Sequence, residues 1–266
     1  MSDRNRIVVW DFDGTLVDSH RKNLRVNHAI VRVLTGRDGS EYPALASIEA
    51  YETAIARATN WREFYAREFD LRDEQVDRAG ELWPRLQAED TTPLLPFAGV
   101  AEALDALAHL PHAIVSQNDS GVIRPALEAA GLADRFRLVL GHGEVGPAGQ
   151  KPAPDGLLRC LELLDGAGPS TLYYVGDHEI DALCVRNARE ALAVVGGDAE
   201  VVSIAAHYGT SAVHGWRCAP DHAATSPADV VRVVLGTRPD ERPQAPGPRG
   251  SPDRERRSAL AQPDSR

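Results

Sequence analysis

The hydrophobic pattern opens with a short, continuous apolar run near the N-terminus. The run RIVVW at residues 6–10 is rich in β-branched side chains and stops at a segment of acidic residues and glycine. A run of this kind is typical of a buried strand that feeds a loop at its carboxyl end. We therefore predict a first strand over residues 6–10 and a polar loop directly after it.

A second pattern, with helical period, extends from residue 19 to about residue 88. Apolar residues recur three and four positions apart among charged ones, in stretches such as SIEAYETAIARA and EQVDRAGELW. This spacing gathers the apolar side chains on one face of a helix, and strand signals are scarce. The segment TTPLLPFAG at residues 91–99 has two prolines and a closing glycine. It predicts a connector that ends the helical block.

Beyond residue 99, helix-like and strand-like segments alternate. The strand-like segments HAIVS, RLVLG and TLYYVG each follow an amphipathic segment, and further apolar runs surround Val194 and Val201. We interpret residues 203–216 as a last strand with its loop, and residues 220–235 as a closing strand, turn and helix. Such alternation predicts an α/β fold with a parallel sheet that helices cover on both faces. Ligand sites of these sheets lie outside the carboxyl ends of the strands.

Together the patterns divide the chain into three parts. Residues 1–17 and 95–236 are predicted to form a Rossmann-like, doubly wound α/β core, and residues 18–94 an inserted helical domain. Residues 237–266 are rich in Pro, Gly, Arg and Asp and have almost no large apolar side chain. Because burial cannot offset the entropy cost of ordering such a segment, we expect a disordered tail.

Composition narrows the class of protein and its partners. The 266 residues carry 29 Lys and Arg against 39 Asp and Glu, a net charge of -10. This acidic field disfavours nucleic acid and anionic membrane surfaces as partners. Cys160, Cys184 and Cys218 form an odd count without a short paired spacing, which predicts neither a disulfide framework nor a zinc site. This cysteine pattern fits a reducing cytoplasm, and the first apolar run is too short for a signal peptide or membrane span, so we expect a cytoplasmic protein. We expect it to be a monomer or a homodimer.

Acidic residues follow two of the predicted strands. The segment DFDGT at residues 11–15 comes directly after the first strand, and GDHEID at residues 176–181 comes directly after TLYYV. Both segments therefore reach the same edge of the predicted sheet. Carboxylates suit a hard cation such as Mg²⁺, which usually takes one or two of them together with phosphate and water.

Two other polar residues also follow predicted strands. Ser116 ends HAIVS, and Lys151 lies in GQKPAP. A hydroxyl donor and a fixed cation are what a transferring phosphoryl group needs for its oxygens. Each feature taken singly has an ordinary explanation as a turn, a helix start or an exposed loop. Their occurrence together, in order along the chain, favours a catalytic site.

The sequence resembles the haloacid dehalogenase superfamily, and in particular its phosphoglycolate-phosphatase-like members. The four motifs of the superfamily match DFDGT, the run ending in Ser116, Lys151, and GDHEID, and the resemblance extends over residues 6–236. The helical insertion is similar to a C1-type cap domain. Relatives often have Thr or Ser followed directly by Asn, whereas Gln117 separates Ser116 from Asn118 here. The resemblance implies a phosphatase for a small phosphorylated metabolite.

The resemblance also implies catalytic roles. Asp11 is expected to attack phosphorus and form an aspartyl-phosphate intermediate. Asp13 is expected to protonate the leaving oxygen and then to deprotonate the hydrolytic water. Lys151 would neutralise Asp11 and the phosphoryl oxygens, and Ser116 would donate a hydrogen bond to the phosphoryl group.

Mg²⁺ is the cofactor that the resemblance implies. Its expected ligands are Asp11, the backbone carbonyl of Asp13, and Asp177, with Asp181 acting through water or from behind these ligands. The acid at Asp13 disfavours dehalogenases, which lack it, and phosphonate-cleaving members, which carry a small residue there.

Specificity is expected to come from the inner face of the insertion. Two clusters of basic and aromatic residues lie in it: His20, Arg21, Lys22, Arg25 and His28, and then Trp61, Arg62, Tyr65 and Arg67. We interpret each of these residues, taken individually, as exposed helix surface. Arg25 or Arg62 remains a candidate for binding a second anionic group. His178 and Glu179 are interpreted as loop-packing residues, and Cys184 as buried.

The core motifs are compatible with other functions. A phosphomutase resembling β-phosphoglucomutase would use the same core residues and differ only in what intercepts the phosphoaspartate. A non-catalytic binding protein could keep the fold, although it would usually have lost one of the acidic or basic motif residues. A response-regulator receiver is disfavoured by the insertion and by the paired acids of DFDGT.

Overall fold

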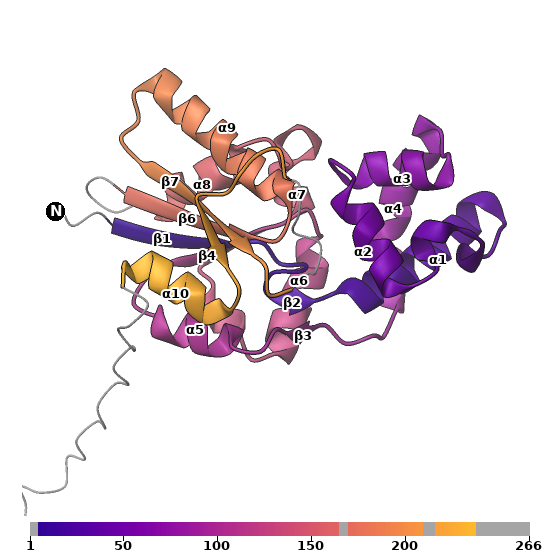
Figure 1. Ribbon diagram of the computed structural model, residues 1–266, viewed down its shortest axis with the longest axis horizontal. Coiled ribbons are helices and arrows are strands. Elements are labelled where there is room, and N and C mark those ends of the chain that lie inside the picture. Colours follow the sequence, from indigo (N-terminus) through magenta and orange to yellow (C-terminus); the bar gives the residue numbers. More distant parts are fainter. Residues whose placement is uncertain (1–4, 165–169, 210–215, 238–266) are drawn as a thin grey trace, which may run out of the picture. The chain divides into compact units, whose positions relative to one another are not determined.

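A six-stranded parallel sheet, with strand order β5-β4-β1-β6-β7-β8, organises the core (Figure 1). The structure is a computed structural model and describes residues 5–164, 170–209 and 216–237. The strands are β1 (Asn5–Trp10), β4 (His112–Val115), β5 (Leu138–Leu140), β6 (Ser170–Gly176), β7 (Glu200–Ala206) and β8 (His222–Ala224).

Strand β1 lies in the interior of this sheet because its side chains are apolar on both faces. Ile7, Val8 and Val9 are fully buried. Val8 pairs with His112 of β4 on one side and with Tyr173 of β6 on the other. Continuous β-branched runs are typical of parallel strands that are covered on both faces. The predicted first strand is confirmed.

Helices cover both faces of the sheet, as Figure 1 shows. They are α5 (Val100–Ala106), α6 (Ser120–Ala129), α8 (Asp155–Leu164), α9 (Glu179–Val195) and α10 (Pro227–Leu235), and α7 (His142–Val145) is a single short turn. One apolar cluster joins α8 and α9 to β1, β4 and β6, and another joins α5, α6 and α10 to the opposite face. The predicted α/β class with a doubly covered parallel sheet is therefore confirmed.

Two details of the core differ from the predictions. The apolar run around Val194 is the end of α9, where Val194 is 87% exposed, and not a strand. The helix continues to Gly196, whose left-handed backbone ends it before β7 begins. The connector also contains β3 (Leu95–Pro96), which pairs antiparallel with β2 (Val17–Asp18). Strands of two residues are too short to show alternation in a sequence.

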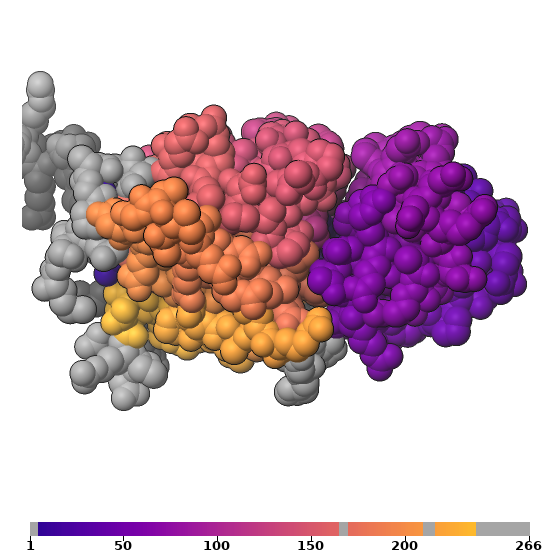
Figure 2. All heavy atoms as spheres, turned by 90° about the horizontal axis from the view of Figure 1, so that it is seen from above, coloured from indigo at the N-terminus to yellow at the C-terminus, as the bar shows by residue number. Residues whose placement is uncertain are grey.

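The chain leaves β2 and returns to β3 through a helical insertion. Its helices are α1 (His20–Thr35), α2 (Ile48–Ala56), α3 (Trp61–Phe69) and α4 (Asp73–Glu89), with two 3-10 turns at Gly39–Glu41 and Pro43–Leu45. In Figure 2 the insertion appears in indigo and purple beside the core. Helix α3 begins where the Asn60 side chain accepts a hydrogen bond from the Glu63 amide.

The insertion has an apolar core of its own. Buried aromatic side chains meet edge to face within it, with ring centroids 5.8 Å apart for Tyr51 and Phe64 and 5.1 Å apart for Phe64 and Phe69. Such contacts add to the stabilisation that burial of the rings provides. The insertion therefore forms a packed helical unit, as its periodicity predicted.

The predicted disordered tail, residues 237–266, lies outside the described residues except for Thr237. Within the described part of the chain, every helix is too short or too polar to cross a membrane.

Candidate active site

Three neighbouring strands bring polar residues to one edge of the sheet. Ser116 follows β4, Asp11 follows β1, and Asp177 follows β6, and these strands are adjacent in the order β4-β1-β6. The Asp11 amide donates to the Val175 carbonyl at 2.8 Å, which continues the ladder beyond the strand. Asp11 is thereby held at the middle of this edge, where parallel α/β sheets place their ligands.

A buried ion-pair network surrounds Asp11. The Lys151 Nζ atom lies 2.9 Å from Asp11 Oδ1 and 2.7 Å from Asp181 Oδ1. Asp181 also accepts hydrogen bonds from the Tyr174 hydroxyl at 3.2 Å and from the His178 amide at 3.1 Å. Since Lys151 and both acids are almost fully buried, the cation and its two carboxylates depend on one another for charge compensation.

Burial and crowding shift the pKa values of these groups. Burial, with a further contribution from the Asp181 carboxylate, raises the pKa of Asp11 to about 7 against the opposing effect of Lys151. Burial and the carboxylates of Asp11 and Asp181 likewise raise the pKa of Asp177 well above its ordinary value. Burial alone would lower the pKa of Lys151, but the two carboxylates beside it raise it instead. The site thus holds more negative charge than Lys151 compensates.

Asp177 comes close to the first motif because Gly14 leaves room for it. The Gly14 backbone is left-handed, with φ of +74°, and a Cβ atom there would lie 2.1 Å from Asp177 Oδ2. Thr15 Oγ1 donates to Asp177 Oδ1 at 3.4 Å. A side chain at position 14 would therefore both strain the turn and displace Asp177.

Three carboxylates could hold a metal ion. Oxygen atoms of Asp11, Asp177 and Asp181 all lie within 4.8 Å of one another. This donor set fits a hard divalent cation such as Mg²⁺, which prefers oxygen ligands, and the raised pKa values of Asp11 and Asp177 reflect the shortage of positive charge. The expected contribution of Asp13 is its backbone carbonyl, and its side chain is not among these three carboxylates.

The Asp13 carboxylate is held by amide groups instead. Asn118 Nδ2 donates to Asp13 Oδ2 at 2.8 Å, and Asn23 Nδ2 lies 3.5 Å from Asp13 Oδ1. Gln87 Nε2 in turn donates to Asn23 Oδ1 at 2.8 Å. A chain of amides therefore runs from α4 of the insertion through α1 to Asp13, while Asn118 holds Asp13 from the core.

Hydrogen bonds at Gln117 and Asn118 connect the segments that carry Ser116 and Lys151. The Asn118 amide donates to Ser116 Oγ at 3.2 Å, and Gln117 Nε2 donates to the Lys151 carbonyl at 3.1 Å. Ser116 and Lys151 both line the same cavity as Asp11 and Asp13. The structure thus brings the four predicted catalytic residues together.

The cavity extends from this edge of the sheet into the insertion and has a volume of about 240 Å³. Its lining on the insertion side is mainly apolar and aromatic. These residues are Asn23, Asn27, Tyr51, Ile55, Trp61, Phe64, Tyr65, Ala79, Gly80, Trp83 and Pro84.

The two arginines considered for a second anionic group are engaged elsewhere. Arg25 Nε donates to Asp90 Oδ2 at 2.8 Å, and Arg62 pairs with Asp77. Neither arginine lines the cavity, so the structure does not support a clamp by Arg25 or Arg62. The interpretation as exposed surface is also wrong for Lys22 and Tyr65, which are both buried.

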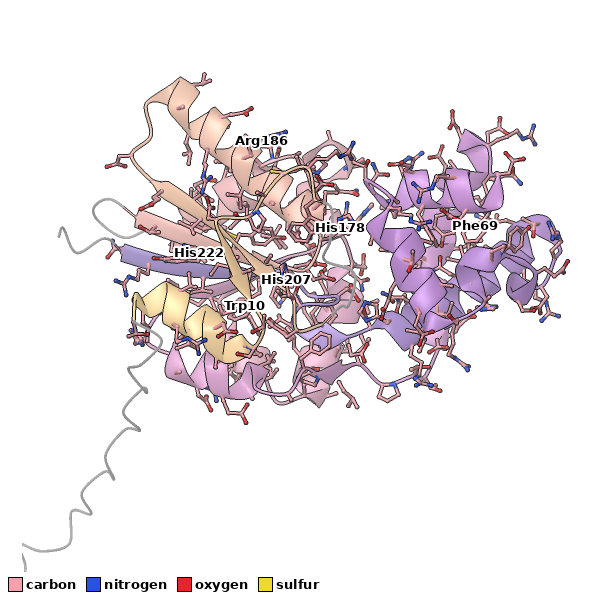
Figure 3. The ribbon with its side chains drawn as sticks, in the orientation of Figure 1. Trp10, Phe69, His178, Arg186, His207 and His222 are labelled. Carbon is pink, nitrogen blue, oxygen red and sulfur yellow. The ribbon has the colours of Figure 1, made fainter. Side chains whose placement is uncertain are left out.

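His178 connects the core to the insertion. Its side chain accepts from the Ile180 amide at the start of α9, and its Nε2 atom lies 3.4 Å from the Ile55 carbonyl. Figure 3 shows His178 at the end of the core that faces the insertion. Burial lowers its pKa, which fits the predicted packing role. Cys184 is fully buried, as predicted.

Sequence reasoning left three site residues without a role. Asn118 lies within the second motif and follows a predicted strand, so its place at the site was readable. Asn23 and Tyr174 carried no such signal, because their contacts with Asp13 and Asp181 depend on how a helix and a strand pack.

Comparisons with known proteins identify the family. The model of haloacid dehalogenase-like hydrolases matches residues 6–189. The phosphoglycolate phosphatase of Escherichia coli strain K12 is 30% identical over 201 residues, which cover 69% of this chain and 78% of the relative. The chain therefore belongs to the haloacid dehalogenase-like hydrolase family and is an enzyme of that family. The resemblance stated from the motifs is confirmed.

Solved structures share the fold at low sequence identity. A predicted phosphoglycolate phosphatase from Haemophilus somnus 129PT has a TM-score of 0.66 at 17% identity, covering 88% of this chain and 99% of that one. CbbY from Rhodobacter sphaeroides, crystallised with xylulose-(1,5)bisphosphate, has a TM-score of 0.61 at 14% identity, covering 84% and 95%.

Proposed function

We propose that this hydrolase is a Mg²⁺-dependent phosphatase that cleaves a small phosphate monoester through an aspartyl-phosphate on Asp11. The observation that carries the proposal is the placing of Asp11 at the middle strand end, 2.9 Å from the Lys151 ammonium and within one cavity with Asp13. A buried carboxylate beside a fixed cation suits attack on an anionic phosphoryl group. The E. coli relative, a phosphoglycolate phosphatase, supports the same class of reaction.

The first half of the reaction forms a bond between an Asp11 oxygen and phosphorus, while the bond from phosphorus to the leaving oxygen breaks. Asp13 donates its proton to the leaving oxygen, which departs as an alcohol. Lys151 and the Ser116 hydroxyl stabilise the negative charge on the phosphoryl oxygens. Asn118 orients Asp13 through the 2.8 Å hydrogen bond to its Oδ2 atom.

In the second half, the Asp13 carboxylate takes a proton from water as the water oxygen attacks phosphorus. The bond between phosphorus and Asp11 breaks, inorganic phosphate leaves, and Asp11 returns as a carboxylate. One acid–base group thus serves both halves.

Asp11, Asp177 and the Asp13 carbonyl would hold Mg²⁺, with Asp181 fixed behind them by Lys151 and Tyr174. Bound there, Mg²⁺ would supply the positive charge that lets an anionic nucleophile approach an anionic phosphate.

We further propose that the insertion, with boundaries near residues 18–94, serves as a cap domain on a core of residues 1–17 and 95–236. The cavity is lined by both parts, so the insertion would exclude water and select the leaving group. Action in the cytoplasm, as a monomer or homodimer without nucleic-acid or membrane partners, stays a prediction from composition.

The test is phosphate release from a panel of phosphorylated metabolites and from 4-nitrophenyl phosphate, with Mg²⁺ and with EDTA. Wild-type activity is expected to need Mg²⁺ and to fall at least about 10³-fold in Asp11→Asn. Asp105→Asn is the matched control, since Asp105 pairs with Arg135 away from the cavity. Retention of activity in folded Asp11→Asn protein would contradict the proposal.

A second measurement addresses the intermediate. Asp13→Asn keeps the nucleophile but lacks the group that activates water. With 4-nitrophenyl phosphate, whose leaving group needs little proton donation, this variant is expected to release a stoichiometric burst of nitrophenolate and then stall. Steady turnover at the wild-type rate would argue against Asp13 as the group that activates water. A bisphosphate requirement with a phosphorylated sugar product would instead support the phosphomutase alternative.

A further inference from the structure

The insertion side of the cavity is built to take a flat group. Trp61, Phe64, Tyr65 and Trp83 all line it. The rings of Trp61 and Tyr65 meet edge to face with centroids 6.2 Å apart. Aromatic walls of this kind bind flat, apolar surfaces in preference to small, strongly hydrated groups.

Helix α4 contains a glycine, Gly80, at the position where it contacts this wall. A Cβ atom at Gly80 would lie 2.9 Å from Cη2 of Trp61, so glycine leaves the space that the indole ring occupies. Glycine inside a helix costs stability relative to alanine. Pro84 lies four residues later and lines the same cavity. It has no N–H group to donate to the Gly80 carbonyl, which leaves that acceptor without its usual helical partner.

Two buried polar atoms on this wall lack a partner among the described residues. They are Asn27 Oδ1 and the Tyr65 hydroxyl. Asn27 Nδ2 donates to the Asn23 carbonyl at 2.8 Å, which fixes the amide so that Oδ1 is the open acceptor. Burial raises the pKa of Tyr65 well above its ordinary value, so its hydroxyl remains a donor. Buried groups of this kind are usually satisfied by hydrogen bonds.

The described lining of the cavity offers no free Lys or Arg side chain for an anionic leaving group. The Arg62 guanidinium lies 5.0 Å from the centroid of the Trp61 ring, but it pairs with Asp77 and does not line the cavity. Among the described residues that line it, Lys151 is the sole Lys or Arg, and it is already paired with Asp11 and Asp181. A carboxylate placed beside the aromatic wall would lose its hydration without gaining a cation. It would also lie in a cavity that contains Asp11 and Asp13.

We propose that the leaving group is an uncharged alcohol that carries a flat ring with a hydrogen-bonding edge. The ring would pack against Trp61, and a donor–acceptor group on its edge, such as an amide, would bond to Asn27 Oδ1 and the Tyr65 hydroxyl. This inference rests on the proposed phosphatase function and specifies its substrate class. It departs from the carboxylate-bearing phosphoglycolate after which the curated relatives are named.

The first test compares kcat/KM for four alkyl phosphates: 4-carbamoylbenzyl phosphate, benzyl phosphate, glycerol 2-phosphate and 2-phosphoglycolate. All are esters of alcohols, so differences in leaving-group acidity are small compared with those between alkyl and aryl esters. The two ring-bearing esters are expected to exceed 2-phosphoglycolate by about tenfold or more, with the carbamoyl compound first. A kcat/KM for 2-phosphoglycolate equal to or above that of both benzyl esters would overturn the inference.

Variants of the wall give the second test. Trp61→Ala is expected to reduce kcat/KM for the ring-bearing esters about tenfold more than it reduces kcat/KM for glycerol 2-phosphate. Gly80→Ala, which places a methyl group against the Trp61 ring, is expected to act in the same direction if the larger truncation fails to fold. Equal losses for glycerol 2-phosphate and the benzyl esters would overturn the role of the wall.

Tyr65→Phe isolates the polar edge. It is expected to remove most of the advantage of 4-carbamoylbenzyl over benzyl phosphate, about fivefold to tenfold for one buried hydrogen bond. Tyr42→Phe is the matched control, because Tyr42 belongs to the same apolar cluster and packs on Phe69 but does not line the cavity. An unchanged advantage in Tyr65→Phe would overturn the assignment of the edge.

Binding separates failure of this inference from failure of the proposed function. If wild-type protein cleaves none of the esters, including 4-nitrophenyl phosphate, the phosphatase function is wrong. Binding of benzyl phosphate and of 2-phosphoglycolate to the Asp11→Asn protein, monitored by tryptophan fluorescence, then decides which of the two leaving groups the cavity prefers. Tighter binding of benzyl phosphate than of 2-phosphoglycolate would support the inference, and equal or weaker binding would overturn it.

Discussion

The two sides of the cavity differ in almost every physical property. The core side gathers charge, with Asp11, Asp177 and Asp181 within 4.8 Å of one another and Lys151 among them. The insertion side is a neutral wall of aromatic rings. The charged residues of the core side would bind the phosphoryl group, which all substrates of such an enzyme share. The aromatic wall would contact the leaving group, which differs from one substrate to another. We infer that chemistry and selectivity are assigned to different regions of the molecule.

Two buried lysines sharpen this comparison, and removal of Lys151 has the largest expected effect. Lys151→Met leaves Asp11 and Asp181 buried without a cation, so we expect a loss of about 3 to 5 kcal/mol in the free energy of unfolding. Activity should also fall by about 10³-fold. Urea unfolding in EDTA and phosphate release measure the two effects.

Lys22→Met is the control from the insertion. Lys22 is as buried as Lys151, but it bonds to the carbonyl and carboxylate of Asp90 and does not line the cavity. We expect it to lose about 1 to 3 kcal/mol of stability with kcat/KM within about threefold of wild type. Equal losses of activity in the two variants would show that the regions are not separate in function.

The close approach of carboxylates on the core side predicts that the free energy of unfolding depends on pH through Asp11. The pKa of Asp11 is raised from 3.8 to about 7 by burial and by Asp181, so its folded form holds the proton more tightly than its unfolded form. The stability that this contributes is present below about pH 4 and is lost as the pH rises through about 7.

In EDTA, wild type should therefore lose about 2 to 3 kcal/mol relative to Asp11→Asn between pH 5 and pH 7.5. Urea unfolding at the two pH values measures this difference. Mg²⁺ is expected to remove it, because a bound cation favours the ionised carboxylate. A difference that is the same at both pH values would contradict the raised pKa.

Asn118 tests the acid–base group within the core. Asn118→Ala removes the hydrogen bond to Asp13, and we expect kcat/KM for alkyl phosphates to fall about 10-fold to 100-fold. For 4-nitrophenyl phosphate the fall should be smaller, since its leaving group needs little proton donation. Equal losses for both substrates would indicate a purely structural role for Asn118.

The smallest expected effect lies at the base of the insertion. Burial raises the pKa of Asp90, but hydrogen bonds from Arg25 and Thr92 outweigh it and lower the pKa to about 2. The resulting stability is present above pH 3.8 and is lost as the pH falls through about 2. Asp90→Asn should lower the free energy of unfolding by about 1 kcal/mol at pH 7 after solvent screening, and by less at pH 3. Urea unfolding at the two pH values measures this difference. A change in kcat/KM would argue against separate regions.

The motifs of the core could be read from the sequence because each is local. DFDGT, Ser116 and GDHEID all follow apolar strands, and parallel strands place their carboxyl ends at one edge. Strand order was not needed to expect Asp11 and Asp177 together. Asn118 was within reach of the same reasoning, but its contact with Asp13 depends on the turn after β4.

The sequence of the insertion predicted its helices but not which of its residues line the cavity. Its period of three to four residues identified the helical block, yet could not tell that Lys22 and Tyr65 are buried or that Arg25 and Arg62 pair with Asp90 and Asp77. Charged and aromatic residues on a helix look alike in sequence whether they face solvent, a neighbour or a cavity.

The sequence by itself determined the α/β core, the helical insertion and the family, because periodicity and strand-end motifs depend on neighbours along the chain. Only the tertiary structure decided which helix faces form the cavity wall and which amides hold Asp13. Those contacts join residues as far apart as Asp13 and Asn118, or Asn23 and Gln87. Packing of whole elements sets them, and no local pattern encodes the angle at which two elements meet.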